Sequence, residues 1–296
     1  MHMPAKTLRA VSGLKPRTIF FHIPKTAGMT LRGLFVRNYR RTAHFNTDLK
    51  NLSLEEWQGC LQRLRNMPKD ELDRYGVFKG HMIFGLHEAL PWPAGYITFL
   101  REPVSRVISH YQMVRLKRGY PSDYEIDLSK ADWNLGVNPA FLRALDNYQT
   151  RALSGADFEI PFGACMKKHL KLAKENMDRH FKFVGLTEQF DLSLMLLRKI
   201  CGWGWRYYVP DNVAPKKSRP VPPNVVEAFR ELNGLDSELY RYARERFERL
   251  VKQYGWKLKT ELDLYRLGNS AHQSLHRLRH KAQRQLGIER RRAVGT

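Results

Sequence analysis

The sequence predicts an α/β protein with three layers, in which a parallel sheet is flanked by helices. Residues 18–23 (TIFFHI) and 96–100 (YITFL) are short apolar runs rich in β-branched and aromatic residues, which is typical of buried strands. A helical pattern follows each run within a few residues. Because a strand, a tight turn and a helix form the repeating unit of a parallel sheet, both segments indicate this class.

The remaining elements are expected in the following order. After the first strand, Leu31, Leu34 and Phe35 form one apolar helical stripe, and Pro103 suits the first turn of a helix that ends near residue 118. Further strands are expected at residues 75–82 and 181–188, and further helices at 51–66, 139–153, 166–179, 190–200, 222–233 and 236–254. Residues 119–136 and 209–224 are rich in residues that break regular structure and predict loops.

Composition indicates a folded protein with anionic partners. Hydrophobic residues make up 43% of the 296 residues, and the net charge is +22. Such a charge favours a nucleic acid, an anionic lipid, an acidic polysaccharide or a phosphorylated small molecule. Three widely separated cysteines predict neither a disulfide framework nor a zinc site, and no stretch resembles a signal peptide or a membrane span. We therefore expect a cytoplasmic protein.

Two parts are expected along the chain. Residues 1–262 form one domain, and residues 263–296 form a basic C-terminal helix or tail. In this tail Leu275, Leu278, Ala282 and Leu286 share one helical face, while arginine, lysine and histidine cover the rest. The pattern is compatible with a terminal helix docked on the domain or with a contact to an anionic membrane or another polyanion.

The turn after the first strand has the composition of an anion site. Its small residues let an anion approach the backbone N–H groups at the start of a helix, where the macrodipole adds positive charge. The predicted ligands are the backbone of Thr26, Ala27, Gly28, Met29 and Thr30, the two threonine hydroxyls and the Lys25 ammonium. The G-x-x-x-x-G-K-[ST] pattern is absent, and no carboxylate pair for Mg²⁺ is visible. We therefore expect a nucleotide bound without metal.

A second anion site is predicted after residues 96–100. Arg101 follows the carboxyl end of this strand, where open α/β sheets bind ligands. Ser109 lies about two turns into the next helix, on the face of Ser105. A guanidinium and a hydroxyl suit a dianionic phosphate.

These motifs resemble those of a known family. HIPKTAGMTL is similar to the 5′-phosphosulfate loop of sulfotransferases that use 3′-phosphoadenosine 5′-phosphosulfate (PAPS), and FLREPVSRVISHY is similar to their 3′-phosphate motif. Together with KGHM, NYQTRALSG, FVGLTEQFDLSLMLL and LDSELYRYARERF, the likeness extends over residues 17–255. It is to the carbohydrate type, related to heparan sulfate 2-O-sulfotransferase and bacterial homologues. The resemblance implies a P-loop nucleotide-hydrolase-like sulfotransferase fold, with PAPS as co-substrate and 3′-phosphoadenosine 5′-phosphate (PAP) as product.

The resemblance also implies roles for single residues. His81 would act as the base that accepts the proton of an acceptor hydroxyl, and Lys25 would stabilise the leaving phosphate. Lys216, Lys217 and Ser218 resemble a late basic loop that reaches the 3′-phosphate. The acceptor implied is a carbohydrate, which the positive charge suggests is anionic.

One motif departs from the family pattern. The 2-O-sulfotransferases have a motif similar to H-G-H, whereas this chain has Lys79-Gly80-His81. We expect Lys79 to hold an acidic acceptor or the sulfuryl group. His87 and Glu88 are further candidates that would orient His81 or replace it as base, and His22 is interpreted as a core histidine.

Two other functions remain open at this point. A small-molecule kinase would use the same kind of anion site, but it requires ATP and Mg²⁺. A module that binds polyanions or membranes would explain the charge and the tail, but it leaves both predicted anion sites unexplained. No specific nucleic-acid recognition is expected.

Overall fold

The computed structural model describes residues 17–47, 49, 53–118, 142–157, 159–204, 207–210 and 220–285. Within these residues, one sheet has the strand order β2-β3-β1-β4-β5, and all neighbouring strands are parallel. The strands are β1 (Thr18–Phe21), β2 (His44–Asn46), β3 (Val77–Gly80), β4 (Gly95–Leu100) and β5 (Phe181–Leu186). The predicted parallel α/β sheet is confirmed, and the short edge strand β2 was not predicted.

Helices connect and cover these strands. The helices are α1 (Gly28–Asn38), α2 (Leu54–Asn66), α3 (Lys69–Leu72), α4 (Pro103–Arg118), α6 (Tyr148–Ser154), α7 (Lys167–His180), α8 (Phe190–Cys201), α9 (Pro223–Leu232) and α10 (Gly234–Gln285). The helix predicted over residues 139–153 is interrupted: residues 142–143 are helical, the chain turns at residues 144–147, where Asn147 has a left-handed φ of 44°, and α6 begins at Tyr148. The loop predicted at 119–136 and most of the loop at 209–224 lie outside the described residues.

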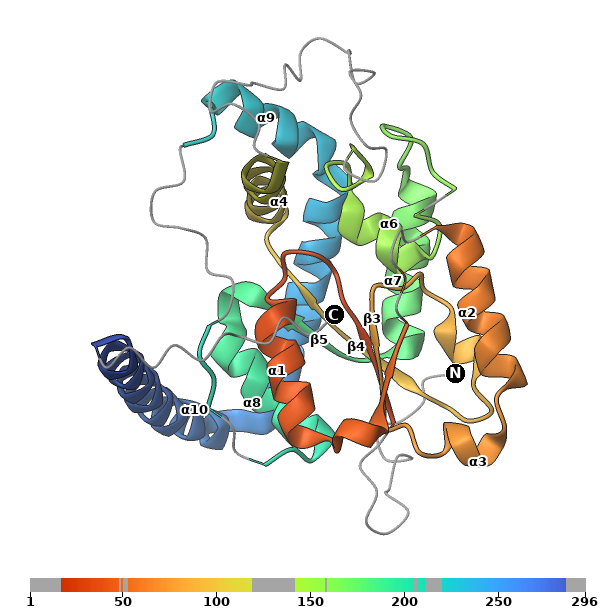
Figure 1. Cartoon of the computed structure of the whole chain (residues 1–296). Helices are drawn as coiled ribbons and strands as arrows, with labels where there is room; N and C mark the ends of the chain where they lie inside the picture. Colours follow the sequence, from red (N-terminus) through yellow and green to blue (C-terminus); the bar gives the residue numbers. More distant parts are fainter. Residues whose placement is uncertain are drawn as a thin grey trace.

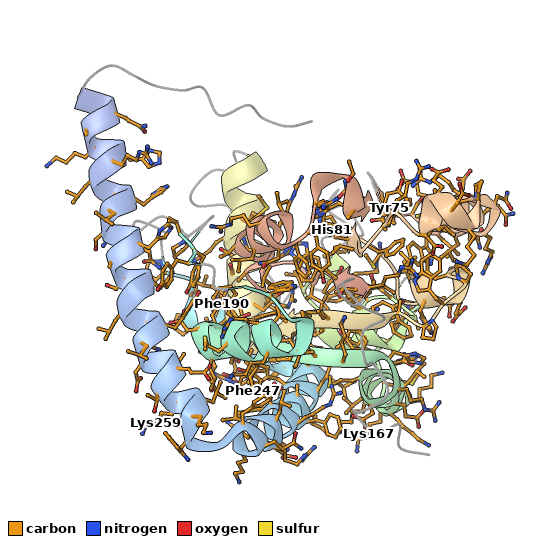
Figure 2. The ribbon with its side chains drawn as sticks, turned by 90° about the horizontal axis from the view of Figure 1, so that it is seen from below. Tyr75, His81, Lys167, Phe190, Phe247 and Lys259 are labelled. Carbon is orange, nitrogen blue, oxygen red and sulfur yellow. The ribbon has the colours of Figure 1, made fainter. Side chains whose placement is uncertain are left out.

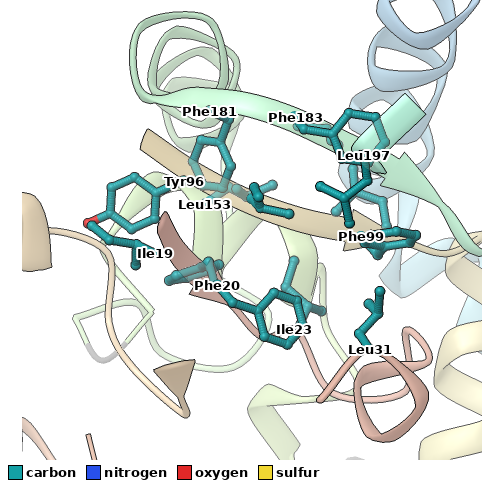
Figure 3. Close-up of a cluster of buried hydrophobic side chains, with 14 of the residues drawn as sticks. Ile19, Phe20, Ile23, Leu31, Tyr96, Phe99, Leu153, Phe181, Phe183 and Leu197 are labelled. Carbon is teal, nitrogen blue, oxygen red and sulfur yellow. The ribbon is translucent and has the colours of Figure 1, made fainter. Parts of the chain in front are cut away.

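The sheet forms the middle layer of the domain. Figure 1 shows α1 and α8 on one side of the sheet and α6 and α7 on the other. On the first side Phe20 packs against Phe35 of α1, with ring centroids 4.8 Å apart. On the second side Tyr96 packs against Phe181 at 5.1 Å. Figure 3 shows part of this core. The burial of its aromatic and aliphatic side chains stabilises the domain.

The sheet order brings the two predicted anion sites to the same edge. Strands β1 and β4 are direct neighbours, with Thr18 opposite Gly95 and Phe20 opposite Ile97. Because they are parallel, the turn from β1 to α1 and the turn from β4 to α4 leave the sheet side by side. Strand β3 pairs with β1 on its other side and ends at Gly80, so His81 follows at the same edge.

A buried polar network ties α6 to the start of α10. The carboxyl group of Asp236 accepts hydrogen bonds from the backbone N–H groups of Gln149 (3.1 Å) and Thr150 (2.7 Å). In return, the backbone N–H of Asp236 donates to the side chain of Asn147 at 2.9 Å. Burial raises the pKa of Asp236, and the nearby Arg106 opposes this shift. The network joins residues almost ninety positions apart and fixes where α6 begins.

Helix α10 consists of two parts. Gly255 has a non-helical backbone (φ 63°, ψ −160°) and bends the helix there, ahead of the boundary expected after residue 262. The second part, residues 256–285, contacts the domain. Lys199 of α8 forms an ion pair with Glu261 at 2.8 Å, and the backbone N–H of Tyr208 donates to Asn269 at 2.9 Å.

Replacing Asp236 by alanine leaves two buried N–H groups without an acceptor. Hydrogen bonds to charged acceptors contribute about 1.5–3 kcal/mol each, so we expect the free energy of unfolding to fall by at least about 2 kcal/mol. Urea denaturation followed by circular dichroism measures this change. Glu245→Ala, at an exposed position of α10, is the matched control and should shift stability by less than about 0.5 kcal/mol. Equal, small effects of the two substitutions would contradict the role of Asp236.

Candidate active site

The turn between β1 and α1 has an unusual backbone. Lys25 and Ala27 both have positive φ angles, 70° and 63°, which non-glycine residues adopt at a cost in free energy. Helix α1 then begins at Gly28, and Ala27 supplies no side-chain cap. The first N–H groups of a helix have no acceptor within the helix, and the first turn of α1 carries no acidic residue. This helix start is therefore suited to an anionic ligand.

The side chains of this turn do not all face a ligand. The hydroxyl of Thr26 is buried and donates to the carbonyl of Ile23 at 2.7 Å, so its proton is used inside the turn. The expectation that this hydroxyl donates to an anion is therefore not supported, although its backbone remains part of the turn. Thr30 is buried in the first turn of α1, whereas Met29 is 42% exposed.

Arg101 joins the two turns directly. Its guanidinium Nη1 donates to the carbonyl of Lys25 at 3.2 Å. Gln149 holds the backbone of Arg101 from both sides, because its side-chain oxygen accepts the Arg101 N–H at 3.0 Å and its Nε2 donates to the Arg101 carbonyl at 2.9 Å. Burial lowers the pKa of Arg101, and Glu188 and Glu102 counteract this. Sequence reasoning placed Arg101 at this edge but did not identify Gln149 as its support.

The start of α4 differs from that of α1. The carboxylate of Glu102 accepts the N–H groups of Val104 (3.0 Å) and Ser105 (2.7 Å) and so caps the helix with its own negative charge. An anion is therefore expected at the Arg101 side chain and not at the amino terminus of α4. Ser109 is partly exposed on α4 about two turns farther along.

His110, which follows Ser109, was not predicted as a site residue. Its pKa is lowered to about 3, first by burial and then by the positive charges of Arg106 and Lys25. The interaction with Lys25 shows that α4 faces the turn between β1 and α1. A histidine four residues after Arg106 on one helix was the available signal in the sequence.

His22 and His81 form a pair of imidazoles at this edge. Their ring centroids are 5.1 Å apart, and the His22 ring lies against Gly28, at the start of α1. The pKa of His22 is lowered to about 3 by burial and by His81. His81, labelled in Figure 2, is exposed, but desolvation still lowers its pKa. Both imidazoles are therefore neutral at pH 7 and are able to accept a proton. His22 is thus a neighbour of His81, not only a core residue.

The backbone around His81 is fixed by Thr47, the residue that follows β2. Gly80 has a φ of 133°, and a Cβ atom there would lie 2.3 Å from Thr47 Oγ1. The Thr47 hydroxyl donates to the carbonyl of His81 at 2.7 Å, and its N–H donates to the carbonyl of Lys79 at 3.0 Å. Glycine is therefore required between Lys79 and His81.

His87 and Glu88 lie away from this site. Both belong to a 3-10 helix (Leu86–Ala89) that packs against α2. The His87 Nδ1 atom lies 3.0 Å from the hydroxyl of Tyr96, and the His87 ring packs on His180 at 4.3 Å, next to the amino ends of β4 and β5. The chain crosses back along the sheet after β3, so the structure does not support either residue as a partner of His81. Lys216, Lys217 and Ser218 lie outside the described residues.

The described part of the chain offers neither a metal-binding cluster nor a membrane-spanning helix. Three or more His, Cys, Asp or Glu side chains do not gather anywhere in it in a way that would hold a metal ion. Within the same residues, no helix combines the length and the apolar character needed to cross a bilayer.

Sequence comparison identifies the family. The sequence model of the family described as galactose-3-O-sulfotransferase matches residues 4–285. The chain belongs to this family. The resemblance to carbohydrate sulfotransferases, predicted from the motifs around Lys25 and Arg101, is thereby confirmed.

Three individual relatives are at most 29% identical to this chain over the aligned residues. The chain is 26% identical to human heparan-sulfate 6-O-sulfotransferase 1 over 62% of its own length and 49% of the relative. It is also 26% identical to human galactose-3-O-sulfotransferase 2, over 57% and 44% of the two chains. Bovine galactosylceramide sulfotransferase is 29% identical over 40% of this chain and 27% of the relative. The matched region thus spans about half or less of these relatives.

The contact between His22 and Gly28 predicts opposite effects of two glycine substitutions in α1. A Cβ atom on Gly28 would lie 1.8 Å from the Nε2 atom of His22, so Gly28→Ala must displace the ring. We expect it to lower the free energy of unfolding by about 1–3 kcal/mol. At Gly33 the nearest atom is 3.9 Å away, and alanine there should raise stability by up to about 1 kcal/mol. Thermal or urea denaturation of both variants measures this, and destabilisation of equal size would contradict the close packing at Gly28.

Proposed function

We propose that the chain transfers a sulfuryl group from PAPS to a hydroxyl group of a carbohydrate acceptor. The hydrogen bond from Arg101 to the carbonyl of Lys25 carries the proposal, because it holds both predicted phosphate-binding turns next to each other. Two anion sites in contact are what a nucleotide with phosphates at both ends requires. The family membership of the chain supports the same class of reaction.

The described residues suit this nucleotide. The 5′-phosphosulfate would bind at the uncapped start of α1, through backbone N–H groups of Gly28 to Thr30 and the Lys25 ammonium. Arg101 and Ser109 would bind the 3′-phosphate. Bound PAPS would supply the sulfuryl group. Lys25 would stabilise negative charge on the leaving phosphate.

His81 would act as the base. It is exposed at the carboxyl edge of the sheet. Because its pKa is lowered, the neutral imidazole predominates at pH 7. The proton of the acceptor hydroxyl would pass to the ring of His81. His22 beside it would disfavour a second positive charge and so help to keep the pair neutral. Relatives named for galactose and galactosylceramide support an acceptor that carries galactose.

Lys79 supports an acceptor with a negative charge. Its side chain is only 7% exposed, and it has no hydrogen bond or ion pair within the described part of the chain. Lys79 lies opposite Phe20 in the register, on the sheet face that α1 covers. Burial lowers its pKa, and Arg32 of α1 lowers it further. A largely buried lysine side chain beside the positive Arg32 favours a neighbouring anion, which a carboxylate or sulfate of the acceptor would provide.

The decisive experiment compares two nucleotides and one variant. PAP should raise the melting temperature of the wild type, because a ligand that binds only the folded state stabilises it, whereas ATP with Mg²⁺ should not. His81→Ala should retain the PAP-induced shift but lose about 10²–10⁴-fold in the rate of sulfation from PAPS. Transfer to a galactoside is measured with radiolabelled PAPS.

The nucleotide and the catalytic base of the proposed reaction are contradicted by different results. Stabilisation by ATP with Mg²⁺ and none by PAP would replace the sulfotransferase with a kinase. Unchanged turnover of His81→Ala would remove His81 as the base. Arg65→Ala, which removes an exposed arginine of α2, is the control and should change neither measurement.

Replacing Lys79 by methionine tests the anionic acceptor. The variant should increase the KM for a disaccharide that carries a glucuronate by at least about tenfold, because a charge-assisted hydrogen bond is lost. The KM for a neutral galactoside and the PAP-induced shift should not change. The variant should be at least as stable as the wild type, since it removes a partly desolvated charge that has no partner among the described residues.

A second lysine, half-buried on β5, provides the contrast. Lys182 donates to the hydroxyl of Thr18 at 2.6 Å and to the carbonyl of Arg17 at 3.3 Å, so Lys182→Met should lower stability. Equal effects of Lys79→Met on both acceptors would contradict the anionic acceptor without touching the sulfotransferase proposal.

A further inference from the structure

The second part of α10 has two apolar faces. Its inner face contains Leu258, Leu262 and Tyr265, which are 1%, 7% and 3% exposed. This face packs on the domain, where Tyr265 lies 5.7 Å from the ring of Tyr207. A Cβ atom on Gly268 would lie 2.1 Å from the Tyr207 hydroxyl, so helix and domain approach closely. The inner face therefore accounts for docking of the helix on the domain.

The outer face is apolar but uncovered. We define the outer stripe as five large side chains that are 64–75% exposed: Trp256, Leu264, Leu267, Leu275 and Leu278. With about 100° of rotation per residue, these positions share a sector opposite the inner face. Exposed leucines of one soluble helix normally occur singly, whereas these four leucines lie on one face in two close pairs, Leu264 with Leu267 and Leu275 with Leu278. Figures 1 and 2 show this part of α10 extending outward from the domain.

Charge identifies the partner of this stripe. Residues 264–285 contain Arg266, Arg277, Arg279, Lys281 and Arg284 but no aspartate or glutamate. Arg277, Arg279 and Lys281 are exposed and flank Leu275 and Leu278. A second copy of the same helix would place like charges against one another. A soluble polyanion would satisfy the charges but leave the leucines and Trp256 in water.

We propose that the second part of α10 lies on the surface of membranes that contain anionic lipids. The outer stripe would enter the boundary between headgroups and acyl chains, and the basic side chains would contact the headgroup phosphates. Docking of the inner face fixes the helix on the domain, so the domain is held beside the membrane. This inference stands on α10 alone and does not depend on the reaction proposed above.

Vesicle binding of the full chain tests the inference. We expect cosedimentation with vesicles of phosphatidylcholine and phosphatidylserine, and much weaker binding to phosphatidylcholine alone. The variant Arg277→Gln/Arg279→Gln/Lys281→Gln should weaken binding about fivefold for each charge removed. The variant Leu267→Gln/Leu278→Gln should weaken it by at least about tenfold. Circular dichroism and melting temperature check that both variants remain folded.

A charge-matched control separates this surface from the overall charge of +22. Lys167, Lys168 and Lys171 are exposed on α7, and Figure 2 shows Lys167 far from the second part of α10. Replacing these three by glutamine should leave vesicle binding unchanged. The inference would be overturned if the control variant lost vesicle binding. It would also be overturned if both α10 variants bound vesicles as well as the wild type does.

Two results would assign the surface to another partner and also overturn the inference. If the charge variant weakens vesicle binding and the leucine variant does not, the surface binds polyanions through charge alone. If the wild type forms a dimer by analytical ultracentrifugation that Leu267→Gln/Leu278→Gln abolishes, and vesicles do not bind, the outer stripe is an interface between two copies.

Discussion

The hydrogen bond from Arg101 to the carbonyl of Lys25 is the constraint on which the candidate site depends. It joins the turns after β1 and β4, which the sheet order makes neighbours. The side chain of Gln149 donates a hydrogen bond to the carbonyl of Arg101, and the backbone N–H of Gln149 donates to the carboxyl group of Asp236. A chain of direct contacts therefore runs from α10 through α6 to the start of α1. The geometry of the candidate anion site is thus set by residues from distant parts of the chain.

Burial gives the cations and the histidines of this edge different charge states. Lys25 and Arg101 are positive groups placed at the start of α1, where the helix dipole also favours an anion. Burial lowers the pKa of His81. Burial and the neighbouring His81 lower the pKa of His22 to about 3. Burial, Arg106 and Lys25 lower the pKa of His110 to about 3. The edge can therefore attract an anionic ligand while its imidazoles stay neutral. For His110, protonation is opposed by Lys25, which is one of the groups expected to hold the anion.

Local patterns were sufficient for most elements of the fold. The apolar runs before Pro24 and Arg101, and the helical periodicities after them, predicted β1, β4, α1 and α4 because each pattern is contained in one short segment. The edge strand β2 was missed, since three residues carry too little periodicity. The helix predicted to end at residue 254 agrees with the bend at Gly255, but its periodicity did not show that a second helical part follows directly and docks on the domain.

The sequence by itself determined the parallel α/β class, and it placed the two predicted anion-binding turns and the candidates Lys25, Arg101 and His81 at one edge, because motifs at the carboxyl ends of strands reach the same edge in any parallel sheet. Only the tertiary structure decided their partners. It placed His22 beside His81, turned the Thr26 hydroxyl inward, removed His87 to the other end of the sheet and buried Lys79 without a partner among the described residues. These features depend on contacts between segments far apart along the chain, which the spacing of residues in a sequence does not encode.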